Sequence, residues 1–176
     1  MKSKISSVRV MLWAGAMFLC FIALYLSFSL ALQRQELSQL NERRHAILGL
    51  ADELRQSSDD LTRFARTYAA TSDPAFKQRF QDVLDIRNGR KHRPEGYNYA
   101  FWDIQIADDV EIKFTDDIAS MEERFVAEGA DNDSMALLLR AKKASDKLAI
   151  LENEAFEMVE QGRSDAALKL LMSDQY

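Results

Sequence analysis

Residues that interrupt helices are scarce in this sequence, which has 6 glycines and 2 prolines among its 176 residues. An all-β fold of this size needs many tight turns, and glycine and proline are the residues that such turns use most often. Their scarcity argues against an all-β fold and favours long helices. Hydrophobic residues make up 47% of the chain, enough for the core of one modest domain in addition to a membrane anchor.

Residues that support catalysis or metal binding do not occur in any recognisable pattern. His45 and His92 are the only histidines, and neither belongs to a metal-ligand motif such as HExxH. There is no phosphate-binding glycine loop and no GxSxG motif. Asp59 and Asp60 are adjacent, and neighbouring side chains on a helix point about 100° apart, so they form no shared dyad. We therefore expect no enzyme activity, no metal and no cofactor, with these side chains solvated.

Basic residues are few after the first part of the chain, and this uneven charge limits the possible partners. Residues 1–32 carry Lys2, Lys4 and Arg9 and no acidic residue. The remainder has 20 basic and 28 acidic side chains, a net charge of −8. Nucleic-acid phosphates repel such a region, so we expect no nucleic-acid partner. Cys20 is the only cysteine, so the chain forms no internal disulfide.

One long apolar run is present, from Val10 to Leu32, and its 23 residues include no charge. At about 1.5 Å per residue it spans a hydrocarbon core of about 30 Å. The preceding basic residues favour an N-terminus in the cytoplasm. A cleavable signal peptide is the alternative, but its apolar core is usually about 7–15 residues long and ends at small residues. The sequence predicts a cytoplasmic tail at 1–9, an uncleaved transmembrane helix at 10–32 and an extracytoplasmic domain at 33–176.

Beyond the apolar run the helical pattern continues. Between Leu32 and Ser72 there is no proline and one glycine, Gly49. Eight of ten positions at three- and four-residue spacing are apolar or aromatic, which is a heptad seam that Leu50 and Phe64 widen. The ten residues are Leu37, Leu40, Arg44, Ile47, Ala51, Leu54, Ser58, Leu61, Ala65 and Tyr68. We expect the transmembrane and soluble parts to form one rod of about 60 residues.

Capping residues mark the later helices. Asp73 followed by Pro74 begins a helix that ends at Asn88 and Gly89. Residues 104–114 suit either a short helix or an irregular segment. The further start signals are Ser120 with Glu123, then Asp131 or Asp133, then Ser164, and the stop signals are Gly129 and Gly162.

The second long helix has an apolar seam of its own, formed by Leu137, Ala141, Ala144, Leu148, Leu151, Ala155 and Met158. Bare seams are unfavourable in water, so we expect the two seams to face each other or a second subunit. The sequence thus predicts an all-α fold in which the transmembrane helix continues into an antiparallel, four-helix-type bundle. No stop signal precedes Tyr176, and we expect the last helix to be truncated there.

The least regular stretch, residues 87–103, begins basic and ends aromatic. Its aromatic residues are able to stack on a ligand or to close the end of a bundle, and its basic residues suit either an anion or a solvated loop. Two arginines on or beside the first seam need a carboxylate or an anionic ligand if they are buried, and otherwise reach water. The candidate ligand-binding residues are Arg63, Arg66, Tyr97, Tyr99, Trp102 and Asp103.

Two segments carry a resemblance to known proteins. LRQSSDDLTRFARTYAATSDPAFKQRFQDVLDIRNGR and RPEGYNYAFWD, within Leu54–Asp103, resemble the extracytoplasmic region of bacterial transmembrane receptors. These receptors include methyl-accepting chemotaxis proteins, sensor histidine kinases and receptors with diguanylate cyclase outputs. RAKKASDKLAILENEAFEMV, Arg140–Val159, is similar to the returning helix of that region. The resemblance implies a helical bundle between two membrane helices, usually dimeric; a second membrane helix, a HAMP-like linker and output motifs are not found in this chain.

Together these features predict the input module of a bacterial receptor, a single-pass protein of the inner membrane that forms a homodimer. We expect a small molecule or a periplasmic protein to be its stimulus, relayed by displacement of the first helix. The alternative is a membrane scaffold whose bundle pairs with that of another membrane protein.

Overall fold

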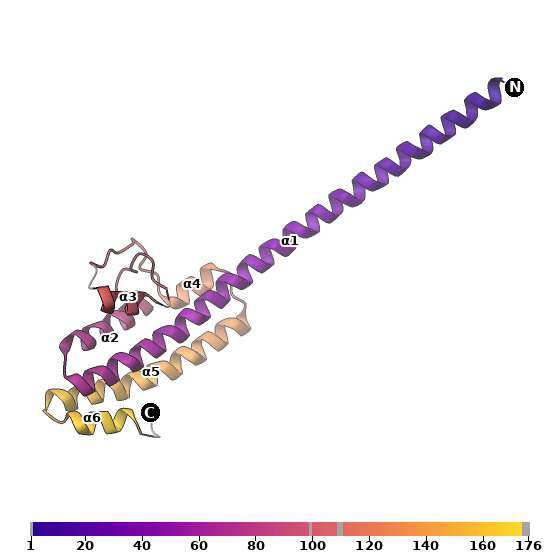
Figure 1. Ribbon diagram of the computed structural model, residues 1–176. Helices are drawn as coiled ribbons and strands as arrows, with labels where there is room; N and C mark the ends of the chain where they lie inside the picture. Colours follow the sequence, from indigo (N-terminus) through magenta and orange to yellow (C-terminus); the bar gives the residue numbers. More distant parts are fainter. Residues whose placement is uncertain (1, 99, 109–110, 174–176) are drawn as a thin grey trace. The chain divides into compact units, whose positions relative to one another are not determined.

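The computed structural model describes residues 2–98, 100–108 and 111–173 (Figure 1). Its helices are α1 (Lys2–Thr71), α2 (Pro74–Arg87), α3 (Phe101–Asp108), α4 (Met121–Ala127), α5 (Asn132–Glu160) and α6 (Ser164–Leu171). These described residues contain no β-strand, only an isolated bridge between Pro94 and Phe114, so the all-α prediction is confirmed. Contacts divide the chain into a first unit, Met1–His45, and a second unit, Ala46–Tyr176, which are described separately.

The first unit is the N-terminal part of α1, and its large apolar side chains are exposed. They include Trp13, Phe18, Phe21, Tyr25 and Phe28. In the part of the chain that the structure describes, one helix near the N-terminus is long and apolar enough to cross a membrane. Such a surface suits lipid, because a helix that is apolar all round is unfavourable in water. Retention of this helix after export, its orientation and the type of membrane stay predictions.

In the second unit the two long helices run in the same direction. The hydroxyls of Ser58 in α1 and Ser145 in α5 are hydrogen-bonded over 2.9 Å. Further along both helices, the rings of Tyr68 and Phe156 meet edge to face with 5.1 Å between centroids. Because residue numbers rise together along α1 and α5, the two helices are parallel.

The shorter α2 runs the opposite way. Lys77 near its start forms an ion pair with Glu160 at the end of α5. Arg87, the last residue of α2, binds Asp146 near the middle of α5 over 2.8 Å. The chain therefore reverses direction between α1 and α2, and α2 is antiparallel to both long helices (Figure 1).

The last helix, α6, returns along the end of the bundle. Its first residue, Ser164, lies 3.2 Å from the hydroxyl of Ser72, and the carbonyl of Leu171 accepts from Nε of Arg66 over 3.2 Å. The prediction that residues 140–159 form the returning helix, antiparallel to the first, was wrong, and α6 is the element that returns. Helical periodicity identifies an apolar face but not the direction of the helix, and the segment between α2 and α5 supplies an additional reversal.

The face that α5 turns to the core also differs from the prediction. Of the predicted seam only Ala155 is buried, while Leu137 is 67% exposed. The true core face includes Ser145 and Glu152, polar residues that a hydropathy pattern passes over. The buried residues of α5 are Leu138, Ser145, Ala149, Glu152, Ala155, Phe156 and Val159. The seam predicted for α1 agrees more closely with the structure of the second unit. Its buried residues there include Leu50, Leu54, Leu61, Phe64, Ala65 and Tyr68.

Aromatic side chains form the main core. Phe64 of α1 packs edge to face against Trp102 of α3 at 5.7 Å between centroids, and Phe80 of α2 packs against Phe156 of α5 at 4.8 Å. Each such side chain contributes about 2–3 kcal/mol when fully buried. A second cluster, at the other end of the unit, consists of Leu50, Leu54, Met121, Phe125 and Leu138. The main cluster joins α1 to α2, α3, α5 and α6, and the second cluster joins α1 to α4 and α5.

Most predicted helix starts are confirmed. The Asp73 carboxylate accepts from the backbone of α2, and Ser120 with Glu123 forms a complete capping box on α4. Asp131, and not Asp133, caps α5. These bonds satisfy N–H groups that a helix start otherwise leaves without partners.

Gly89 is the position where backbone conformation limits the sequence most. Its φ is +68°, and a Cβ there lies 2.8 Å from the carbonyl oxygen of Ile118 and 2.9 Å from the nitrogen of Ser120. Gly96 has a similar φ, +66°, but nothing within 4 Å of the added atom. The pair thus separates the cost of the left-handed conformation from the cost of close backbone packing.

We expect Gly89→Ala to lower the free energy of unfolding by more than about 2 kcal/mol, and Gly96→Ala by about 1 kcal/mol, the cost of conformation alone. Thermal unfolding of the full chain in detergent, followed by circular dichroism, measures both. Equal losses in the two variants contradict the close approach of residue 89 to the 118–120 segment.

Candidate functional site

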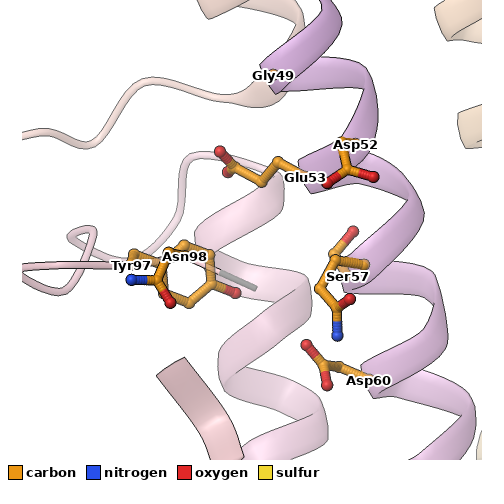
Figure 2. A pocket seen from close by; sticks show the side chains of 8 residues that line it. Gly49, Asp52, Glu53, Ser57, Asp60, Tyr97 and Asn98 are labelled. Atoms are coloured by element: carbon orange, nitrogen blue, oxygen red, sulfur yellow. The ribbon is translucent and has the colours of Figure 1, made fainter. Parts of the chain in front are cut away.

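A cavity of about 230 Å³ lies between α1 and the irregular segment that follows α2. Figure 2 shows Glu53, Ser57 and Asp60 on its α1 side and Tyr97 and Asn98 on the other. Six of its lining residues occupy one face of α1 at three- and four-residue spacing, and none of the eight is basic. The lining residues are Gly49, Asp52, Glu53, Gln56, Ser57, Asp60, Tyr97 and Asn98. The lining residues therefore include three carboxylates.

Glu53 joins three segments at the edge of this cavity. Its carboxylate accepts from both terminal nitrogens of Arg93, with 2.7 Å for one pair, and from Nη1 of Arg124 in α4 at 3.0 Å. The guanidinium of Arg93 also lies over the ring of Tyr97, 4.8 Å from its centroid. Because these side chains are largely buried, the bidentate bond is strong and fixes the segment and α4 to α1.

Asp60 lies deeper in the wall and is only 4% exposed. Burial raises its pKa above the ordinary value, and the adjacent Arg63, whose Nη2 donates over 2.7 Å, opposes that shift. Arg63 also pairs with Asp103 of α3. The arginine therefore bridges a buried and an exposed carboxylate, and it links α1 to α3.

Tyr97 forms the aromatic side of the site, and Trp102 contacts it from the core. Burial raises the pKa of the Tyr97 phenol to about 12. The Trp102 indole donates to the phenol oxygen over 3.3 Å. Trp102 itself is 3% exposed and packs against Phe64, so it belongs to the core, as the bundle-end interpretation predicted. Tyr97 thus contacts the core residue Trp102 and also lines the cavity.

A second polar group lies inside the bundle. Arg87 is 2% exposed and donates to the Ser145 hydroxyl and the Asp146 carboxylate, each over 2.8 Å. Burial lowers its pKa, while the carboxylates of Asp146 and Glu152 act in the opposite sense. Of the two alternatives for the basic run, the solvated loop describes Arg90 and His92, whereas Arg87 and Arg93 are held by carboxylates. These carboxylates come from distant parts of the chain.

The structure brings most of the predicted ligand-binding residues together. Arg63 binds Asp103 and the lining residue Asp60, and Trp102 binds Tyr97, so that of these four residues Tyr97 alone lines the cavity. Arg66 lies apart from them, because its Nε donates to a carbonyl of α6. Tyr99 lies outside the described residues. Ligand binding by any of these residues stays a prediction.

Sequence reasoning missed the α1 wall of the cavity. The available signal was the row of polar residues on one helix face beside the apolar seam, from Asp52 through Gln56 to Asp60. Such a row is usually solvated, and only the segment that carries Tyr97 and Asn98 encloses it.

The described lining of the site supplies carboxylates, amides, a hydroxyl and a phenol. Among the residues that the structure describes, no group of three or more His, Cys, Asp or Glu side chains is arranged to hold a metal ion. His45 and His92 are both exposed. Each lining carboxylate has an arginine partner, Arg55 for Asp52 being the most exposed case. The arrangement offers hydrogen-bond acceptors to a small polar molecule, and a cation in the cavity competes with these arginines for the carboxylates.

Comparison with protein-family models, with curated proteins and with solved structures found no match for this chain. The resemblance to bacterial receptors therefore rests on the segments quoted above, and it stays a prediction.

We expect Glu53→Gln to lower the free energy of unfolding by about 2 kcal/mol, because two largely buried arginines lose their carboxylate. The matched control is Asp59→Asn, which removes an exposed carboxylate six residues further along α1 and changes stability by less than about 0.5 kcal/mol. Urea unfolding of both variants makes the comparison. A loss for Glu53→Gln no larger than that of the control contradicts the role of Glu53 in attaching the irregular segment and α4 to α1.

The raised pKa of Tyr97 predicts a loss of stability in base. The unfolded chain ionises this phenol near pH 10 and the folded chain near pH 12. Its contribution is therefore complete below pH 10 and is lost as the pH rises towards 12. Between pH 8 and pH 11 we expect wild type to lose about 1.4 kcal/mol relative to Tyr97→Phe in urea unfolding. Parallel pH profiles for the two proteins argue against a buried phenol.

Proposed function

We propose that this chain is the input module of a bacterial transmembrane receptor and that a small polar molecule binds in the cavity beside α1. The observation that carries the proposal is the composition of α1, one helix from Lys2 to Thr71. It contains both the apolar run of residues 10–32 and the polar wall of the cavity, residues 49–60. A contact made in the cavity therefore acts directly on the helix that is suited to cross the membrane.

The cavity favours a ligand with a cationic or hydrogen-bond-donating group. Its lining has three carboxylates and no basic side chain, with amide groups from Gln56 and Asn98 for further hydrogen bonds. The available volume suits a compact molecule and excludes a folded protein. Among the two stimuli expected from the sequence, a small molecule is therefore the one that this site supports.

A signal requires that the ligand binds two arrangements of the helices with different affinity. The ion pairs of Glu53 with Arg93 and Arg124, called here the Glu53 clamp, provide two such arrangements. A ligand cation that attracts the Glu53 carboxylate competes with Arg93 and Arg124, which hold the irregular segment and α4 to α1. Weakening either ion pair permits a small shift of α1 relative to α4, and helix shifts of about 1–2 Å are sufficient in known switches.

The membrane context completes the proposal. Lys2, Lys4 and Arg9 favour a cytoplasmic N-terminus, with the second unit outside the inner membrane of a bacterium. A homodimer is the assembly that the resemblance implies. The runner-up function, a membrane scaffold that pairs with another protein, is favoured by one observation, the exposed apolar row on α5 that begins at Leu137.

A melting scan tests the ligand site directly. The full chain in nanodiscs is screened against small amines, diamines, quaternary ammonium compounds, amino acids and carboxylic acids. We expect one class of cations to stabilise the second unit, by about 2.7 kcal/mol when its concentration is 100 times its Kd.

The control uses Gly49, which lines the cavity and has nothing within 4 Å of an added Cβ. Gly49→Leu adds a side chain at the cavity wall and is expected to abolish the melting shift, whereas Ala70→Leu, at an exposed position of the same helix, is expected to retain it. The proposal fails if no compound shifts the melt, or if the shift survives in Gly49→Leu.

A further inference from the structure

The outer side of α5 carries an apolar row that no part of the described chain covers. Leu137 is 67% exposed, Ala141 and Ala144 are exposed, and Leu148 and Leu151 are partly exposed. The five residues follow one another at three- and four-residue spacing, so they share one face over about 21 Å of helix. Aliphatic side chains in such a row are typical of a helix that packs against another helix.

Basic side chains border this row on one side. Arg140, Lys143 and Lys147 line a shallow groove together with Ala144, Leu148 and Leu151, with a volume of about 510 Å³. Within the described residues none of these three cations forms an ion pair, in contrast to Lys142, which pairs with Glu122 and Asp146. The groove therefore offers apolar contact along its floor and unbalanced positive charge along its edge.

The end of α5 shows how the same face is covered. Ala155 continues the spacing of the row and is fully buried, and α6 returns from α5 and packs on that end with Ala167 and Leu171 buried. Figure 1 shows α6 beside the C-terminal part of α5 only. The antiparallel helix α6 thus packs on the C-terminal end of α5. The exposed row lies on the same side of α5, nearer to its N-terminus.

We propose that the α5 face binds one amphipathic helix of a partner protein, antiparallel to α5, with apolar residues at three- and four-residue spacing and Asp or Glu along its edge. A second copy of this chain suits the face less well. Symmetric pairing of two α5 faces in the same antiparallel arrangement brings Arg140, Lys143 and Lys147 of each copy towards the same cations of the other, and like charges oppose such contact. The charge of the groove therefore selects an acidic partner helix.

Two synthetic peptides of about 20 residues probe the face. They share an apolar row at three- and four-residue spacing, and one has Glu and the other Lys on the flanks. Each carries a fluorophore and is titrated with the full chain in nanodiscs of neutral lipid, with empty nanodiscs as the blank, and anisotropy is measured. We expect the acidic peptide to bind at least tenfold more tightly than the basic one.

Matched variants locate the binding. Leu137→Asn is expected to weaken the acidic peptide at least tenfold, whereas Ile150→Asn leaves its affinity unchanged, because Ile150 is equally exposed, at 69%, but lies off the row. Replacing Arg140, Lys143 and Lys147 together by Glu is expected to reverse the preference between the peptides. Circular dichroism of each variant verifies the fold.

Three outcomes overturn the proposal. The first is equal binding of the two peptides, and the second is equal weakening by Leu137→Asn and Ile150→Asn. The third is self-association of the chain that Leu137→Asn abolishes while the acidic peptide fails to bind, since a second copy then occupies the face. The small-molecule melting scan is independent of all three, because Gly49 and the cavity lie on α1.

Discussion

The packing of α1 against α2 and α5 is the interaction on which the second unit depends. Phe64 and Tyr68 of α1 meet Trp102 of α3 and Phe156 of α5, and Phe80 joins them from α2, so a single cluster fixes four helices. Edge-to-face contacts of this kind constrain orientation as well as distance. With the helices fixed in this way, the polar side chains at their edges have defined partners, and the cavity has a defined shape.

The polar groups of the unit lie at different depths around that core, from the inside of the bundle to its edge. Arg87 lies inside the bundle between α2 and α5, Asp60 lies in the cavity wall, and Glu53 lies at the edge where the irregular segment and α4 are attached. Buried ion pairs add little net stability compared with apolar packing, but they are costly to break and therefore specify one arrangement. This property makes the Glu53 clamp suitable for a switch, because competition for one carboxylate affects two attachments at once.

The residues of the candidate site were only partly predictable, and the reason lies in their separation along the chain. Arg63 and Tyr97 were identified from their position near the seam and in an aromatic segment. Glu53 was not, because its partners Arg93 and Arg124 are 40 and 71 residues away and no local pattern connects them. The sequence likewise left two alternatives open for the basic run, because the carboxylate partner of Arg87 comes from α5.

What the sequence determined by itself is local: the apolar run, the helices and their caps, and the α1 seam, because periodicity and capping act within a few turns of helix. The tertiary structure alone decided that α1 and α5 are parallel, that the face of α5 with Ser145 and Glu152 is buried, and that the row from Leu137 is left bare. Those features depend on which segments meet in space. A helix with apolar residues on two adjacent faces offers two ways to pack, and only the positions of its neighbours select one.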